Sequence, residues 1–179
     1  GMFVGIDVGG TNLKAGLVDD TGRILAAERR PLGTFQGPEA FAADLALLAA
    51  AAAEKGGVAP QTLEYVGIGL PGSVRGGEVL YTTNIPMEHV DLETLFRAHL
   101  DRPLILGNDA DCAAVGEYFC GAGRGSGNFV VITLGTGIGS GLILGGKLYT
   151  GMGSGGEAGH MVIRHGGEPC PCGRKGCWE

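Results

Sequence analysis

The chain has 179 residues, of which 44% are hydrophobic and 18% charged, a globular balance that excludes an intrinsically disordered polypeptide. The net charge of −6 argues against nucleic acid or an anionic membrane as the main partner, and no uncharged apolar run is long enough to span a bilayer. The 36 glycines follow no fixed period, which excludes a collagen-like chain; they gather beside apolar runs, where a backbone turns sharply or approaches a ligand.

The first third of the chain predicts a small antiparallel sheet followed by a helix. Residues 3–8, 13–18 and 23–27 are predicted strands, and the Asp-Asp-Thr-Gly sequence at 19–22 is a turn signal. Because the connections are short, these strands should form an antiparallel meander. The Ala- and Leu-rich residues 38–55 begin with proline and are followed by two glycines, which is typical of a helix.

The remainder predicts strands that alternate with helices and then a final set of strands. The predicted strands are residues 65–70, 103–106, 129–134, 141–144 and 147–149, with a hairpin turn at Gly145-Gly146. The predicted helices are residues 91–99, with Asp91 as the cap, and 109–119. This order indicates an α/β arrangement with an antiparallel extension, and the glycine-rich residues 121–127 could join two lobes.

Two turns rich in glycine and threonine are candidate phosphate-binding sites. In the first, Asp7 ends a strand and Gly9-Gly10-Thr11 leads into the next, so that backbone N–H groups could face a phosphate. Thr11 adds a hydroxyl, Lys14 a cation and Asp7 a carboxylate for magnesium. The second turn, LGTGIGSG at 134–141, repeats this pattern without charges, and two such turns could hold one polyphosphate from opposite sides. Each could equally be an ordinary glycine hairpin.

A segment that resembles a P-loop is rejected as a phosphate-binding site. Residues 141–147 have the GxxxxGK spacing of a P-loop, but Leu148 stands where serine or threonine is required. The segment also falls within two predicted strands rather than between a strand and a helix.

Two carboxylates, Asp109 and Asp111, directly follow a buried strand. Strand ends that meet a helix start are where α/β proteins hold ligands. From these residues alone, an N-terminal helix cap is the favoured role for Asp109, and Asp111 fits a first-turn charge that interacts with the helix dipole.

Three of the five cysteines, Cys170, Cys172 and Cys177, lie within eight residues. An odd count without a secretion signal favours a reducing cytoplasm and a metal site, and a disulfide between Cys170 and Cys172 would be strained. Tetrahedral zinc would need a fourth ligand, for which His160 and His165 are the nearby imidazoles. The other two cysteines, Cys112 and Cys120, are expected to pack without a chemical role.

Taken together, the segments DVGGTNLK, LGTGIGSG, GNDAD, GGEAGH and CPCGRKGCWE resemble the ROK family of bacterial sugar kinases and sugar-responsive repressors, over residues 3–179. The resemblance implies an actin-like ATPase (ribonuclease H-like) fold with two lobes, residues 2–108 and 109–179. The family continues past the cysteine motif into the adenosine site, so the second lobe is expected to be incomplete. Gly1 before Met2 is typical of a scar from a cleaved tag.

The resemblance also implies roles for individual residues. Asp109 would be the catalytic base, and the sugar would be bound by Asn84, Asn108, Asp109, Glu157, His160 and Glu179. ATP and Mg²⁺ would be held by Asp7, Gly9, Gly10, Thr11, Asn12, Lys14, Gly135, Thr136, Gly137 and Gly139. A structural zinc would be bound by His160, Cys170, Cys172 and Cys177. Asn84 precedes Ile85-Pro86, and a role as a turn residue is equally open.

The expected function is therefore ATP-dependent phosphorylation of a hexose, most simply glucose at its 6-hydroxyl, in the cytoplasm. One alternative is a sugar-sensing transcriptional regulator of the same family, and another is a fragment that binds sugar and zinc without turnover. The first phosphate strand is predicted to begin at residue 3, so no helix-turn-helix domain is expected ahead of it; Lys14 also matches the kinase form, and the kinase is the preferred expectation. No nucleic acid or membrane partner is expected, and the full-length protein could be a homodimer.

Overall fold

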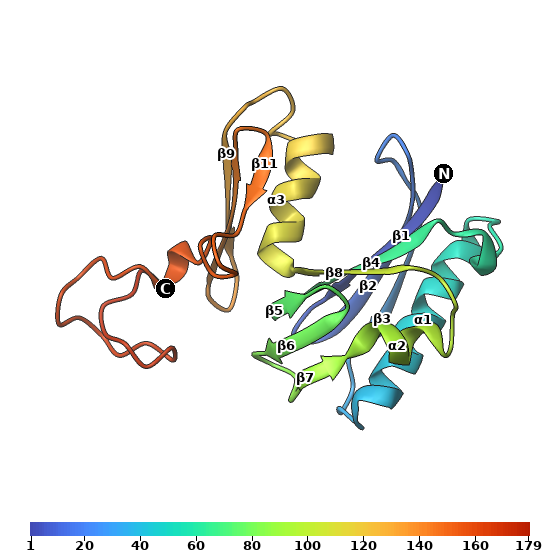
Figure 1. Cartoon of the computed structure of the whole chain (residues 1–179), viewed down its shortest axis with the longest axis horizontal. Coiled ribbons are helices and arrows are strands. Elements are labelled where there is room, and N and C mark those ends of the chain that lie inside the picture. Colours follow the sequence, from blue (N-terminus) through green and yellow to red (C-terminus); the bar gives the residue numbers. More distant parts are fainter. The chain divides into compact units, whose positions relative to one another are not determined.

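The computed structural model describes all 179 residues and divides into two compact units, Gly1–Asp109 and Ala110–Glu179 (Figure 1). The glycine-rich residues 121–127, expected to join two lobes, instead lie inside the second unit. None of the helices combines the length and the apolar character needed to cross a bilayer.

The first unit is built on a five-stranded mixed sheet in the order β3-β2-β1-β4-β8. Its strands are β1 (Met2–Val8), β2 (Asn12–Asp19), β3 (Ile24–Pro31), β4 (Tyr65–Leu70) and β8 (Leu104–Asn108). The first three pair antiparallel, which confirms the predicted meander, and β1, β4 and β8 are parallel. The third strand extends four residues beyond its predicted end because it pairs with β2 along its whole length.

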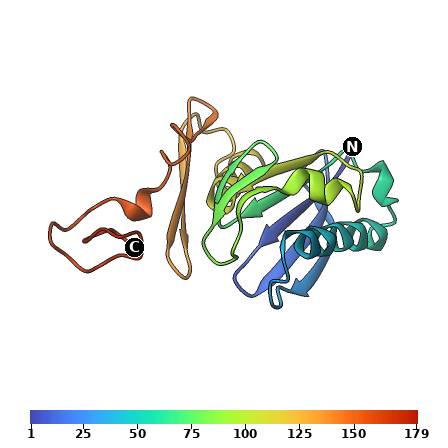
Figure 2. The same cartoon turned by 60° about the horizontal axis from the view of Figure 1, so that its bottom comes forward.

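One face of this sheet is covered by α1 (Pro38–Lys55), which Figures 1 and 2 show lying along the strands. Alternate residues of β1 and β2, among them Ile6 and Leu17, are buried against Leu45 and its neighbours on the helix. The second helix, α2 (Leu92–Arg97), has the predicted cap, because the Asp91 carboxylate accepts a hydrogen bond from the Thr94 N–H at 3.1 Å. This helix ends two residues before the predicted His99.

A small antiparallel sheet in the first unit was not predicted. It consists of β5 (Gly72–Arg75), β6 (Glu78–Thr82) and β7 (Glu88–Asp91). These strands are short, and β7 carries three charged or imidazole side chains in four residues, so no clear apolar alternation marks them in the sequence.

The second unit is a three-stranded antiparallel sheet packed against one helix, followed by a C-terminal segment with little regular structure. The strands are β9 (Phe129–Leu134), β10 (Ile138–Leu144) and β11 (Lys147–Tyr149), and the helices are α3 (Asp109–Cys120) and the 3₁₀ turn η2 (Ala158–His160). The hairpin between β10 and β11 is confirmed, since Gly145 and Gly146 both have positive φ, of 57° and 77°. β10 begins three residues earlier than predicted.

Candidate functional site

The first glycine turn is closed by backbone hydrogen bonds at the end of β1. The Gly9 N–H donates to the Asn12 carbonyl at 2.9 Å, and the Leu32 N–H donates to the Thr11 carbonyl at 2.9 Å, which fixes the turn to the end of β3. A Cβ at Gly9 would lie 2.9 Å from the Asn12 carbonyl oxygen, so this position requires glycine. The turn is therefore held in one conformation by its own backbone.

The charged side chains beside this turn face away from α1. Asp7 and Lys14 lie opposite each other in the β1–β2 pair and are exposed, whereas their neighbours in sequence are buried. Because side chains alternate along a strand, Asp7 and Lys14 share the face of the sheet that α1 leaves uncovered. Asn84 also lies near the turn, with its Nδ2 4.0 Å from where a side chain at Gly10 would begin.

Asn108 and Asp109 are placed at the same edge of the sheet as Asp7. The parallel register aligns Asp7 with Gly69 and Gly69 with Gly107, so β1, β4 and β8 end together. Asn108 ends β8, and its Nδ2 donates to the Gly72 carbonyl at 2.9 Å, which orients the amide. Asp109 follows as the first residue of α3. A carboxylate, a lysine and the glycine turn are thus gathered with Asn108 and Asp109 within the first unit.

In the second unit, the second glycine turn connects β9 to β10 and contacts the last residue of the chain. The Gly135 N–H donates to the Gly137 carbonyl at 3.0 Å, and the Glu179 carboxylate accepts from the Ile138 N–H at 3.2 Å. Thr136 is exposed at the tip. Gly139 lies inside β10, where a Cβ would meet the Thr133 and Ala110 side chains, so packing already accounts for glycine there.

The loop that carries Glu157 and His160 is anchored by a buried hydroxyl that sequence reasoning missed. Ser140, only 4% exposed, donates to the Gly156 carbonyl and accepts from the Ala158 N–H at 2.9 Å. Its position on a strand with apolar neighbours was the available signal, since a buried serine needs hydrogen-bond partners. Glu157 is exposed beside this anchor.

The chain end is tied to the same loop through its backbone. The Glu179 N–H donates to the Gly159 carbonyl and the Trp178 N–H to the Met161 carbonyl, both at 2.9 Å. The backbone of Glu179 is therefore bound to Gly159, which lies between Glu157 and His160 in the sequence.

Four side chains form a candidate metal centre. The ligand atoms of His160, Cys170, Cys172 and Cys177 all lie within 4.8 Å of one another. The Cys170 Sγ is 3.6 Å from the His160 Nδ1, and the Cys172 Sγ is 3.6 Å from the Cys177 Sγ. Tetrahedral zinc with Zn–S bonds of about 2.3 Å holds its sulfurs roughly 3.8 Å apart, so these residues fit the ion. His165 is exposed and outside the cluster.

The surroundings of the cluster shift the pKa values of two of its thiols in opposite directions. A hydrogen bond from the Arg174 backbone, aided by the neighbouring thiol of Cys170, lowers the pKa of Cys172 to about 6. Desolvation, with the neighbouring thiols, raises the pKa of Cys177 to about 11. The side chain of Arg174, which was not predicted from the sequence to take part, also links the cysteine loop to His160. Its Nη2 donates to the His160 carbonyl at 3.1 Å.

Comparison with known proteins relates this chain to one family. The family model described as "ROK family" matches residues 3–179. A glucokinase of Streptomyces coelicolor is 39% identical over 182 residues, which cover all of this chain and 55% of that protein. The xylose repressor of Bacillus subtilis is 33% identical and is covered over 47% of its length.

A solved structure extends the relationship to the fold. The ROK family glucokinase from Streptomyces griseus in complex with glucose and AMPPNP superposes with a TM-score of 0.86 at 38% identity; the match covers all of this chain and 56% of that one. The chain therefore spans about half the length of the relatives that it matches.

Proposed function

The chain belongs to the ROK family, and from this premise we propose that it carries the phosphate-binding turns, the catalytic base and the sugar-binding residues of an ATP-dependent hexose kinase. Glucose is the proposed substrate and its 6-hydroxyl the proposed acceptor. The Streptomyces relatives named as glucokinases support this choice.

The proposed phosphate site begins at the first glycine turn. Backbone N–H groups of Gly9, Gly10 and Thr11 are suited to phosphate oxygens, and Lys14 would neutralise their charge. Asn12 would assist from the start of β2. The second turn, with Gly135, Thr136, Gly137 and Gly139, is the other proposed phosphate-binding turn. Asp7 would hold Mg²⁺, an ion that neutralises the charge developing on the phosphates when it is bound.

Asp109 would act as the general base. As the sugar oxygen forms its bond to the γ-phosphorus, the bond from that phosphorus to the β-γ bridging oxygen breaks and ADP leaves. The hydroxyl proton passes to the Asp109 carboxylate. Asn108, held by the Gly72 carbonyl, would orient the sugar, together with Asn84.

Glu157, His160 and Glu179 would complete sugar recognition. A structural zinc on His160, Cys170, Cys172 and Cys177 would stabilise the fold of the loop that carries them. All four ligand positions come from protein, so this zinc would have no activated water. One imidazole nitrogen of His160 would bind the metal, and the other would remain for a sugar hydroxyl.

The observation that carries the proposal is the shared edge of the first-unit sheet, where Asn108 ends β8, Asp109 follows it, and Asp7 is the next-to-last residue of β1. The test is Asp109→Asn, which removes the base with little change in size. Phosphorylation of glucose, measured as ADP release, should fall by about 10²- to 10⁴-fold. Asp111→Asn, on the same helix, is the matched control and should retain most of the activity.

The assay is best run on both the 179-residue chain and the longest natural polypeptide that contains it. An Asp109→Asn enzyme with a wild-type rate would rule out the assigned base. If even the longest polypeptide binds glucose but releases no ADP, the second candidate function would be favoured.

That second candidate is a sugar-sensing regulator, and the specific observation in its favour is the 33% identity to a xylose repressor. A regulator would bind sugar without consuming ATP.

A third possibility is that this length of chain binds sugar and zinc but lacks turnover. We propose a cytoplasmic location, because an odd number of cysteines favours a reducing compartment, and a homodimer for the longer protein.

A further inference from the structure

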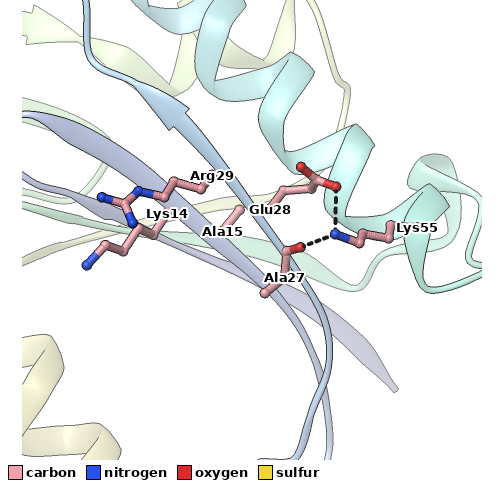
Figure 3. Close-up of a pocket in the computed structure, with 6 residues that line it drawn as sticks. All are labelled: Lys14, Ala15, Ala27, Glu28, Arg29 and Lys55. Atoms are coloured by element: carbon pink, nitrogen blue, oxygen red, sulfur yellow. Dashed lines mark hydrogen bonds and ion pairs between the residues drawn. The ribbon is translucent and has the colours of Figure 1, made fainter.

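The uncovered face of the first-unit sheet carries an arginine next to Lys14 that sequence reasoning did not single out. Arg29 of β3 lies directly opposite Lys14 of β2 in the antiparallel register. Both are exposed, and Figure 3 shows their side chains extending in the same direction, away from Glu28 and Lys55. The two cations therefore share a face and adjoin the first glycine turn.

The neighbouring cations have acidic partners, whereas these two do not. Arg30, which points to the helix side, pairs with Asp44 at 3.6 Å, and Lys55 pairs with Glu28 at 3.1 Å. Neither Lys14 nor Arg29 forms an ion pair in the structure. Like charges directly opposite each other destabilise a strand pair, so an anion bound by both would relieve this repulsion.

The remaining charged group of this face is Asp7, opposite Lys14 on β1. Asp7, Lys14 and Arg29 thus lie in a row across three neighbouring strands, and with strands about 4.8 Å apart the row spans roughly 10 Å. Along β3, the residues on the same face as Arg29 are Ala27 and Pro31, which add no negative charge. A hollow of about 440 Å³ is lined by Lys14 and Arg29 together with Ala15, Ala27, Glu28 and Lys55.

We propose that Arg29 is a second cation of the first phosphate turn, and that Lys14 and Arg29 together bind a condensed phosphate chain, either the triphosphate of a nucleotide or an inorganic polyphosphate. The proposal rests on the proposed function in placing a phosphate donor at this turn. A guanidinium suits this task because its planar N–H groups match two phosphate oxygens at once.

The test is calorimetric titration of the 179-residue chain with inorganic tripolyphosphate and, separately, with ATP, both with Mg²⁺. Arg29→Gln should weaken the binding of tripolyphosphate about tenfold, which is typical for the loss of a charge-assisted hydrogen bond. Arg30→Gln removes an equal charge from the opposite face and should change affinity by less than about twofold. Arg29→Lys should recover part of the loss, and urea unfolding should show that all variants are folded.

The two ligands distinguish the sources of the phosphate chain. Weaker binding of both by Arg29→Gln identifies a site for triphosphates in general, and weaker binding of tripolyphosphate alone identifies one for the inorganic chain. Unchanged affinity in Arg29→Gln, or no binding of either ligand by the wild type, would overturn the proposal. The titration contains no sugar and detects no turnover, so the kinase assignment can fail in the ADP-release assay while this binding persists.

Discussion

At the scale of single residues, two glycines close together in the sequence have different surroundings. Gly5 lies in β1, and a Cβ built there meets no atom within 4 Å, whereas a Cβ at Gly9 would press on the Asn12 carbonyl oxygen at 2.9 Å. That carbonyl already accepts the hydrogen bond that closes the turn. Gly9 is thus required by the turn geometry, and Gly5 is not required by its surroundings.

Substitution of these two glycines tests whether the turn conformation matters for phosphate. Gly9→Ala should destabilise the protein by about 1–3 kcal/mol, because backbone must move to make room for the methyl group. It should also weaken ATP binding. Gly5→Ala is the matched control and should be neutral or slightly stabilising, since alanine restricts the unfolded chain more than glycine does. Urea unfolding and titration with ATP measure both effects; equal behaviour of the two variants would show that the turn tolerates a side chain.

At the scale of elements, the helices, strands and clusters that have a local sequence pattern were predicted correctly. Helix α1 has a proline at its start and glycines after its end, the meander has short turns, and the cysteine spacing predicted three members of the cluster. The small sheet β5–β7 was missed because its strands are short and polar. Arg29 was missed for another reason: its proximity to Lys14 depends on the register between two strands, which the sequence does not show directly.

The C-terminal cluster is the element whose stability should depend on a bound metal. Cys172→Ser should reduce bound zinc at least tenfold, as measured by elemental analysis after dialysis against a chelator, because a hydroxyl replaces a thiolate ligand. Cys120→Ser is the matched control, since Cys120 is exposed at the end of α3 and outside the cluster.

The same variants test the proposed link between zinc and sugar. Loss of the metal should weaken glucose binding far more than ATP binding, because Glu157, His160 and Glu179 belong to the loop and chain end that the cluster joins. Equal weakening of both ligands would show that zinc supports the fold in general rather than the sugar site.

At the scale of the whole molecule, the predicted fold class is confirmed: the chain has a mixed α/β sheet with an antiparallel meander and superposes on a ROK glucokinase. Apolar burial is distributed unevenly between the two units. The main core cluster lies entirely within the first unit, between its sheet and its helices. In the second unit only Ala110, Ala114 and Ile143 are buried apolar residues, while Val130 and Leu134 of β9 are 53% and 80% exposed. The second unit should therefore have the lower intrinsic stability.

This difference predicts two unfolding transitions that can be followed separately. Trp178 is the sole tryptophan and lies in the second unit, so its fluorescence reports on that unit, whereas α1 contributes most of the helical circular dichroism from the first. In urea, the fluorescence transition should precede the circular dichroism transition. Added zinc should raise the first midpoint and leave the second nearly unchanged, because all four candidate ligands belong to the second unit. Coincident transitions that shift together with zinc would instead show that the two units unfold as one cooperative body.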